Sequence, residues 1–286
     1  MTDSVSTTKN VLITGCSSGI GHELALSFHR LGHRVWATAR NIQTLTELDK
    51  EGIQCLELDV LDHAQIQSVV DKVLATDNKL DILVNNAGYG AMGPLVETSD
   101  AELRRQFDTN VFAPMALVRE VVPAMQQQRQ GMIINIGSVV GEFVTPFAGS
   151  YSASKAAINM LSDALRMELK PFGIQVVTVQ PGAVRSQFAS NADKALDQIW
   201  QKDSIYQPIE VDVRKRAQAS QDNPTEVEDF CRALVAKIES GKPLNVIRLA
   251  NGSKTLPLVK VLLPTRWLEW ILGRAFGLNK LAQKSK

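Results

Sequence analysis

Short apolar runs and longer amphipathic segments alternate along the first two thirds of the chain. The short runs are rich in β-branched residues and predict buried strands at 10–14, 34–39, 53–58, 80–84 and 132–137. The longer segments carry apolar residues at helical spacing and predict helices at 22–31, 62–76, 101–127, 150–170 and 224–239. Alternating strands and helices over this length are typical of one α/β domain.

The first strand leads directly into a glycine-rich turn, GCSSGIG at 15–21, and then into a helix. A dinucleotide-binding unit requires strand, glycine turn and helix in this order. Gly15 permits the sharp turn, Gly19 lets the backbone approach a pyrophosphate, and Gly21 lets the helix pack closely on the sheet. The helix amino terminus then attracts phosphate. A glycine-rich turn alone is nonspecific, so this interpretation depends on the rest of the chain.

Arg40 ends the second predicted strand, where a fold that binds a ribose 2′-hydroxyl would place Asp or Glu. An arginine suits a 2′-phosphate through charge-assisted contacts, and the Ser17 hydroxyl could donate as well. We therefore expect NADP(H) rather than NAD(H), although a solvated loop would also accept this arginine. Asp59 and Val60 end the third strand, where Asp59 could hold the adenine edge or cap the next helix.

Tyr151 and Lys155 stand four residues apart, so a helix at 150–170 places both on one face. A free phenol has a pKa near ~10, and an adjacent positive charge favours the phenolate. Such a pair can supply a proton-transferring acid or base at neutral pH. Taken alone, the same pattern is more often an ordinary surface pair, so it needs support from other residues.

Small and polar residues follow the fourth and fifth strands. The segment 85–88, NNAG, can turn sharply while offering backbone amides to a ligand. Ser138 ends the fifth strand, at the edge where open α/β sheets bind ligands. Asn110 lies inside a predicted helix, where asparagine is unfavourable, so it is either exposed or part of a deliberate local distortion.

Composition narrows the possible functions. The 286 residues are 44% hydrophobic with a formal net charge of +1, as in a single soluble globular domain. Basic residues are scattered among acidic ones, so we expect no nucleic-acid partner. The three cysteines lack metal-ligand spacing, which predicts a reduced, cytoplasmic setting and no metal site. No secretion signal or membrane-spanning run is expected.

Taken together, these motifs resemble the short-chain dehydrogenase/reductase family, in its conventional-length branch. The resemblance covers 10–185 and rests on TGxxxGIG at 14–21, Asp59-Val60, Asn85-Asn86-Ala87-Gly88, Asn110, Ser138, Tyr151-x-x-x-Lys155 and Pro181-Gly182. It implies an α/β fold consisting of a single doubly wound (Rossmann) domain, with a seven-stranded parallel sheet and helices on both faces. It also implies an NADP(H)-dependent oxidoreductase acting on CH-OH groups.

The same resemblance implies a catalytic tetrad of Asn110, Ser138, Tyr151 and Lys155. Tyr151 would exchange a proton with the substrate oxygen, and Lys155 would lower the Tyr151 pKa and hold the nicotinamide ribose. Ser138 would hydrogen-bond the substrate oxygen, and Asn110 would hold the helix distortion and a water that links Lys155 to solvent. The expected cofactor contacts are Gly15, Ser17, Ser18, Gly19, Ile20, Gly21, Arg40, Asp59, Val60, Asn86, Ala87, Gly88, Tyr151, Lys155, Pro181, Gly182, Val184 and Ser186.

One position departs from the family pattern. The family usually places a threonine four residues after the glycine of its Pro-Gly pair, whereas this chain has Ser186. Serine keeps the hydroxyl without the methyl group, so we expect Ser186 to contact the nicotinamide carboxamide. The neighbouring Arg185 has no predicted role.

Two later segments should set specificity. Segment 186–223 is long and mixed in charge and is predicted to be a substrate lid. Segment 255–286 is an apolar tail in which Trp267 and Trp270 stand among basic residues. The tail suits a membrane surface, the mouth of the substrate site, or a partner subunit. Each of these roles favours a hydrophobic substrate.

The glycine turn, the strand end at Arg40, the lid and the tail look most like the 17β-hydroxysteroid dehydrogenase and retinol dehydrogenase-like subgroup. That likeness suggests a steroid, retinoid or long-chain lipid substrate. Two alternatives are reduction of a 3-ketoacyl thioester or other small carbonyl, and a non-enzymatic NADPH-sensing or interaction protein. The family commonly forms homodimers or homotetramers through the helices expected at 101–127 and 150–170.

Overall fold

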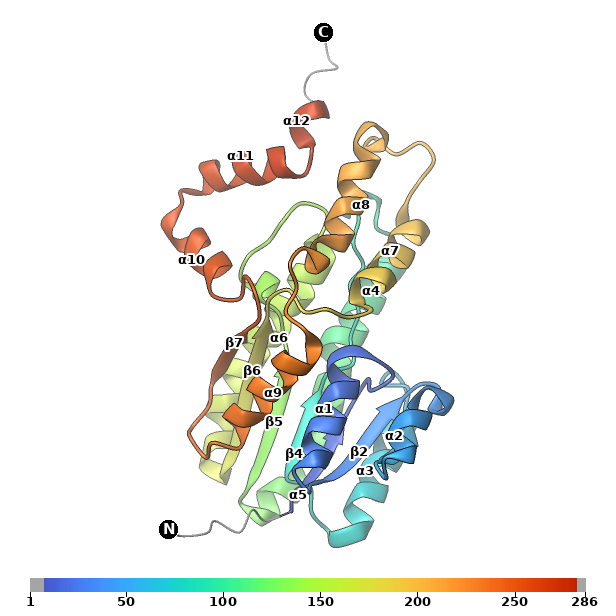
Figure 1. Ribbon diagram of the computed structural model, residues 1–286, viewed down its shortest axis with the longest axis vertical. Helices are drawn as coiled ribbons and strands as arrows, with labels where there is room; N and C mark the ends of the chain where they lie inside the picture. The colour runs from blue at the N-terminus through green and yellow to red at the C-terminus, as the bar shows by residue number, and fades with distance from the viewer. Residues whose placement is uncertain (1–7, 282–286) are drawn as a thin grey trace.

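The computed structural model describes residues 8–281, and its centre is one seven-stranded parallel sheet (Figure 1). The strands are β1 (Asn10–Ile13), β2 (Arg34–Ala39), β3 (Gln54–Glu57), β4 (Ile82–Asn85), β5 (Gly131–Ile136), β6 (Ile174–Pro181) and β7 (Val246–Leu249). Their order across the sheet is β3-β2-β1-β4-β5-β6-β7. The five strands predicted from apolar runs are confirmed to within two residues at either end.

Helices cover both faces of the sheet, which confirms the doubly wound fold. One face carries α1 (Gly19–Arg30), α2 (Thr46–Lys50) and α9 (Val227–Ile238); the other carries α3 (His63–Asp77), α5 (Ala113–Gln128) and α6 (Gly149–Leu169). Successive β1 side chains point to opposite faces of the sheet. Val11 and Ile13 pack against the layer of α1, α2 and α9, and Leu12 packs against the layer of α3, α5 and α6. A parallel sheet covered on both faces favours runs of apolar residues, as in β1 and β4, each of which has a single polar residue.

The helix predicted at 101–127 is interrupted. It consists of α4 (Asp100–Phe107), a π-helical turn at Asp108–Phe112, and α5. Asn110 lies inside the turn and is only 2% exposed. Its side chain bonds to groups outside its own helix, which offsets the irregular backbone. Of the two roles left open for Asn110, the structure therefore supports the local distortion.

The sheet reverses its winding between β1 and β4, so the loops that follow these strands diverge. Ligands of open α/β sheets bind in the crevice outside the carboxyl ends of the strands at such a point. The glycine turn follows β1, and segment 85–88 begins at the end of β4. Ser138 follows β5 at the same edge. The fold therefore gathers the predicted motifs at one edge of the sheet.

The predicted lid and tail form a third layer beyond that edge (Figure 1). The lid contains α7 (Phe188–Ile199) and α8 (Glu210–Gln218), whose apolar faces pack with Phe147 in a separate cluster. The tail contains α10 (Thr255–Leu262), α11 (Thr265–Ala275) and α12 (Leu278–Leu281), and residues 282–286 lie outside the described part. Phe276 packs against the lid cluster, so this part of the tail lies against the lid.

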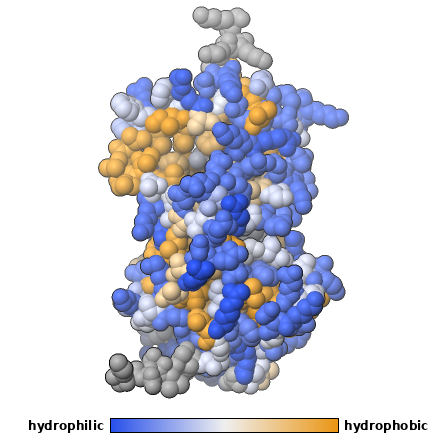
Figure 2. Space-filling view, viewed as in Figure 1, coloured by the Kyte–Doolittle hydropathy of each residue, from blue (hydrophilic) through white to orange (hydrophobic). Residues whose placement is uncertain are grey.

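The other end of the tail remains uncovered. Trp267 and Trp270 are 66% and 62% exposed, and Val261 is also exposed. Figure 2 shows the resulting hydrophobic patch over the region of α10 and α11. Within residues 8–281, no helix has both the length and the apolar content needed to cross a bilayer.

Candidate active site

One cavity of about 870 Å³ runs along the carboxyl edge of the sheet and extends beneath the lid and tail. It brings together all the predicted site residues except Gly21 and Asn110. Those lining it are Gly15, Ser17, Ser18, Gly19, Ile20, Arg40, Asp59, Val60, Asn86, Ala87, Gly88, Ser138, Tyr151, Lys155, Pro181, Gly182, Val184 and Ser186. Gly21 and Asn110 lie directly behind this wall.

The glycine turn is fastened to the loop after β4. Gly15 has a φ of +73°, and a Cβ there would stand 2.8 Å from the Ala87 Cα. The side-chain amide nitrogen (Nδ2) of Asn86 donates to the carbonyl oxygens of Thr14 and Gly15, at 2.9 and 3.0 Å. A Cβ on Gly21 would collide with the Asn86 side chain and the Gly15 carbonyl. The turn is therefore held in position by close backbone approach, which only glycine allows at these two positions.

The amino terminus of α1 is left open toward the cavity. Ser18 occupies the N-cap position, yet its side chain makes no capping hydrogen bond, and the first turn holds no acidic residue. By contrast, Asp62 caps α3 and Ser99 caps α4 through their side chains. The free amides and the helix dipole of α1 together suit an anionic group. This end of the cavity therefore fits a dinucleotide pyrophosphate.

The expected adenosine end has a free basic group. Arg40 is exposed at the cavity and forms no salt bridge with any acid in residues 8–281. Asp59 accepts a hydrogen bond from the Leu61 amide at 3.0 Å. The cap of α3 is Asp62, whose carboxylate accepts from two backbone amides. The alternative that Asp59 caps this helix is therefore wrong, and its side chain lies at the cavity instead.

Tyr151 and Lys155 occupy one face of α6, and both side chains are buried at the cavity wall. The Lys155 Nζ lies 5.8 Å from the centroid of the Tyr151 ring. It donates a 2.7 Å hydrogen bond to the Ile136 carbonyl at the end of β5. This anchor fixes the ammonium between the sheet and the helix, so the pair is a buried arrangement rather than a surface one.

Burial dominates the electrostatics of this pair. It raises the pKa of Tyr151 to about 12, while the Ser138 hydroxyl and the charge of Arg216 lower it. Burial also lowers the pKa of Lys155 to about 8. The sequence suggested Lys155 as the group that lowers the Tyr151 pKa. In the structure, the charge that lowers the Tyr151 pKa comes from Arg216 in the lid.

Asn110 lies behind the cavity wall that carries Lys155. Its Oδ1 accepts from the Tyr89 amide at 3.2 Å, and its Nδ2 donates to the Tyr89 carbonyl and the Ser154 hydroxyl. A Cβ on Gly88 would stand 3.0 Å from Asn110 Oδ1 and 3.7 Å from Lys155 Nζ. The π-helical turn thus holds Asn110 beside the loop that lines the cavity next to Lys155.

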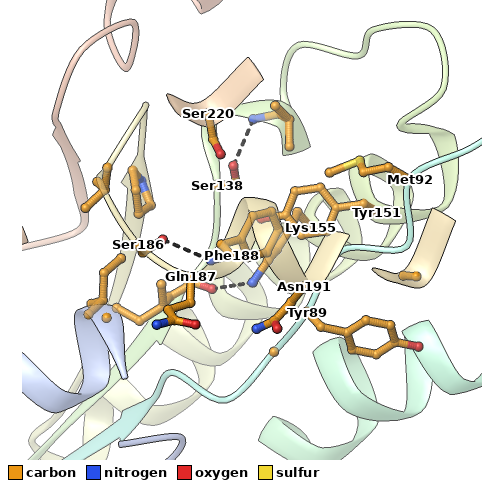
Figure 3. A pocket seen from close by; sticks show the side chains of 18 of the residues that line it. Tyr89, Met92, Ser138, Tyr151, Lys155, Ser186, Gln187, Phe188, Asn191 and Ser220 are labelled. Atoms are coloured by element: carbon orange, nitrogen blue, oxygen red, sulfur yellow. Dashed lines mark hydrogen bonds between the residues drawn. The ribbon is translucent and has the colours of Figure 1, made fainter. Parts of the chain in front are cut away.

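Two residues of the lid that line the cavity, Phe188 and Arg216, were not predicted from the sequence. Phe188 lies against Tyr151, with ring centroids 5.2 Å apart at 49° (Figure 3). Arg216 is a basic residue on the apolar face of α8, between the buried Val213 and Ala217. A charge at an apolar helical position was the available signal. The lid aromatics noted in the sequence, Trp200 and Tyr206, pack instead into the lid cluster.

The segment after β6 joins the lid to the glycine turn. The Ser186 hydroxyl accepts a hydrogen bond from the Phe188 amide at 3.3 Å. A Cβ on Gly19 would stand 3.2 Å from the Ser186 Cβ, so the two segments touch. Arg185 makes a 2.8 Å ion pair with Glu226 at the start of α9. Arg185 therefore links the segment after β6 to the start of α9, whereas Ser186 lines the cavity.

Known proteins share this sequence pattern and architecture. A short-chain dehydrogenase/reductase of Pestalotiopsis microspora is 33% identical over 98% of both chains. The structure of a short-chain dehydrogenase from Streptomyces avermitilis superposes with a TM-score of 0.79, at 29% identity over 98% of this chain and 99% of that one. A serine dehydrogenase complexed with NADP+ gives a TM-score of 0.73, at 28% identity over 86% and 96%. The profile of the short chain dehydrogenase family matches residues 9–197, and this chain belongs to that family.

Proposed function

We propose that this protein is an NADP(H)-dependent oxidoreductase that interconverts a hydroxyl and a carbonyl group on a hydrophobic substrate. One observation carries the proposal. The buried pair Tyr151 and Lys155 shares a single cavity with the open amino terminus of α1. A proton-transferring group and a phosphate-binding site in one cavity are what cofactor-dependent carbonyl reduction requires. The bound nicotinamide would supply or accept the hydride.

The chain's own residues move the proton and stabilise charge. The Tyr151 hydroxyl gives its proton to the substrate oxygen in reduction and removes it in oxidation. Ser138 donates a hydrogen bond to the same oxygen, where negative charge develops. Lys155 holds the nicotinamide ribose and stabilises the Tyr151 phenolate after proton transfer. Phe188 covers the tyrosine ring and keeps water from it.

Two residues favour NADP(H). Solved structures of this fold are described with either NAD or NADP, so the choice depends on this chain's residues. Arg40 stands at the end of β2 without an acidic partner in residues 8–281, and Ser17 is exposed in the glycine turn. A guanidinium there binds a 2′-phosphate through charge-assisted hydrogen bonds.

The cavity wall favours a hydrophobic substrate. Beyond Tyr151 it is lined by Met92, Phe143, Phe188, Leu256, Leu272 and Phe276. These side chains come from the loop after β4, the loop before α6, the lid and the tail. The lining fits the earlier resemblance to the 17β-hydroxysteroid dehydrogenase and retinol dehydrogenase-like subgroup, so we propose a steroid, retinoid or long-chain lipid substrate. A 3-ketoacyl thioester is the competing class.

The exposed apolar surfaces support two further contacts, which we propose for a cytoplasmic protein. Phe112, Met160 and Met167 are exposed on the π-helical turn and α6, which supports a homodimer or homotetramer that pairs through these helices. Trp267 and Trp270 lie on α11 beside Arg266 and Arg274, which supports peripheral contact between the tail and a membrane surface.

The decisive experiment replaces Tyr151 with phenylalanine. Reduction by NADPH is measured with a panel of ketosteroids, retinal, aliphatic aldehydes and acetoacetyl thioesters. General acid catalysis contributes about 10²- to 10⁴-fold, so we expect kcat to fall by that factor for the accepted substrate, with unchanged NADPH affinity. Tyr206→Phe, which removes a phenol from the lid cluster, is the matched control. Undiminished turnover by Tyr151→Phe would refute the mechanism, and NADPH binding with no turnover of any panel member would favour the sensor alternative.

A further inference from the structure

Arg216 lies on the inner, apolar face of α8. Val213 and Ala217 share this face, and both are buried. Arg216 itself is only 6% exposed and lines the cavity that contains Tyr151. A charged side chain in such a position is rare unless it has a partner. The groups that contact this guanidinium therefore decide whether its charge is neutralised.

The described residues do not neutralise this charge. Arg216 donates from Nε to the Thr145 hydroxyl, and its guanidinium carbon lies 5.9 Å from the centroid of the Phe276 ring. It makes no ion pair with any carboxylate in residues 8–281. Its two terminal nitrogens have no hydrogen-bond partner there, and they are not among the fully enclosed polar atoms. They therefore remain accessible from the cavity.

Arg214 shows that acids are available in the same helix. Two residues earlier, its guanidinium pairs with Glu210 at 2.9 Å and with Asp197 at 2.8 Å. Arg216 faces the opposite way and has no such partner among residues 8–281. Burial lowers the pKa of Arg216 to about 10, which still leaves it cationic at neutral pH. A buried charge without an opposite charge is costly, so a bound anion would relieve that cost.

We propose that Arg216 binds a carboxylate of the substrate, so that the preferred substrates are hydrophobic carbonyl or hydroxyl compounds that also carry an acid group. This inference refines the substrate class and rests on the proposed function. Two free terminal nitrogens match the two oxygens of a carboxylate in a bidentate contact. Met92 and Phe143 line the same cavity and accommodate the apolar part of such a molecule.

The position of Arg216 separates it from the expected cofactor phosphates. Its contacts are Thr145, which precedes α6, and Phe276, which follows α11 in the tail. Its charge acts on Tyr151, the residue that meets the substrate oxygen. The pyrophosphate site lies instead at the amino terminus of α1, and the 2′-phosphate site at Arg40. The anion bound by Arg216 therefore belongs to the substrate.

A binding experiment tests the anion site without turnover. Decanoate and decanol are titrated into the full-length protein saturated with NADP+, using wild type, Arg216→Gln and Arg214→Gln. A hydrogen bond to a charged group contributes enough for about a tenfold to hundredfold change in affinity. We expect Arg216→Gln to weaken decanoate binding by that factor, to leave decanol within about twofold, and Arg214→Gln to change neither.

Three results would overturn the proposal. They are equal losses for decanoate and decanol in Arg216→Gln, undiminished decanoate binding by that variant, and no decanoate binding by wild type. NADPH affinity is measured in parallel, because a loss confined to the cofactor would reassign Arg216 to a phosphate. Arg216→Lys should restore part of the decanoate affinity, since it keeps the charge but not the planar fork.

Turnover separates this inference from the proposed function. ω-Oxodecanoate and its methyl ester are compared as substrates with NADPH. We expect wild type to prefer the acid in kcat/KM by at least about tenfold, and Arg216→Gln to lose that preference. Reduction of both compounds without preference would refute the acid requirement and leave the oxidoreductase function standing. If neither compound is reduced while decanoate binding still depends on Arg216, the proposed reaction fails and the anion site stands.

Discussion

The Lys155 ammonium lies 5.8 Å from the centre of the Tyr151 ring, and its hydrogen bond goes to the carbonyl oxygen of Ile136. It makes no ion pair with a carboxylate in residues 8–281. The protein therefore holds a buried cation that is costly for folding but useful beside the tyrosine that we propose as the proton donor. Stability and activity should respond in opposite directions when this residue changes.

We predict that the stability difference between wild type and Lys155→Met depends on pH. The pKa of Lys155 falls from 10.5 to about 8 on folding, so between these values the unfolded chain binds the proton more tightly. The full cost of the buried charge is present below about pH 8 and is relieved as pH rises. The free energy of unfolding of wild type should therefore gain on the order of 2 kcal/mol relative to the variant between pH 7 and pH 10.

Urea unfolding of both proteins at the two pH values measures this change. Tyr151 and the cysteines titrate in both proteins, so their effects largely cancel in the difference. A constant difference across this range would mean that Lys155 keeps its ordinary pKa in the folded protein. Turnover should be lost in the variant at every pH, because the phenolate loses its neighbouring charge.

Arg40→Asp should change the preferred cofactor. An acid at this strand end repels a 2′-phosphate and can bind a ribose 2′-hydroxyl. We expect the ratio of kcat/KM for NADPH to that for NADH to fall by at least about tenfold, as for the loss of one charge-assisted hydrogen bond. Lys50→Asp, an equal charge change on α2 outside the cavity, controls for net charge. An unchanged ratio would remove Arg40 from cofactor selection.

Gly15→Ala should impair cofactor binding more than its backbone strain explains. Gly15 and Gly32 have similar positive φ values, +73° and +79°, so alanine strains both by roughly 1–2 kcal/mol. Only at Gly15 would the new Cβ meet the Ala87 backbone, at 2.8 Å, whereas Gly32 has open space. We expect both variants to lower stability and Gly15→Ala alone to weaken NADPH binding, by at least about tenfold. Equal affinities, measured by fluorescence titration, would show that the turn adjusts freely.

The tail should bind anionic lipid through its exposed tryptophans. Trp267 and Trp270 stand beside basic residues on α11, a combination that suits the headgroup region. Trp267→Ser combined with Trp270→Ser should reduce cosedimentation with phosphatidylserine-containing vesicles by at least about fivefold, with turnover retained. Phe112→Ser removes an exposed aromatic outside the tail and should leave lipid binding unchanged. Absence of lipid binding by wild type would instead favour a protein partner for this patch.

The amino-acid sequence alone determined the alternation of strands and helices, the glycine turn and the positions of Tyr151 and Lys155 on one helix. These features follow from local properties: side-chain periodicity, glycine's access to positive φ, and four-residue helical spacing. Even Asn110 was recognisable as unusual from its poor helix propensity. The sequence left open whether Asn110 is exposed or part of a distorted helix. The hydrogen bonds of its side chain with Tyr89 and Ser154, which are distant in the chain, decide for the distorted helix.

Only the tertiary structure decided the environment of each group. The burial that sets the pKa values of Tyr151 and Lys155 depends on the sheet and the lid together. Phe188 and Arg216 reach the cavity because α7 and α8 fold over the carboxyl edge, and the tail divides into a packed end at Phe276 and an exposed end at Trp267. Such contacts join residues distant in sequence, and their energies depend on solvent exclusion, which local periodicity does not encode.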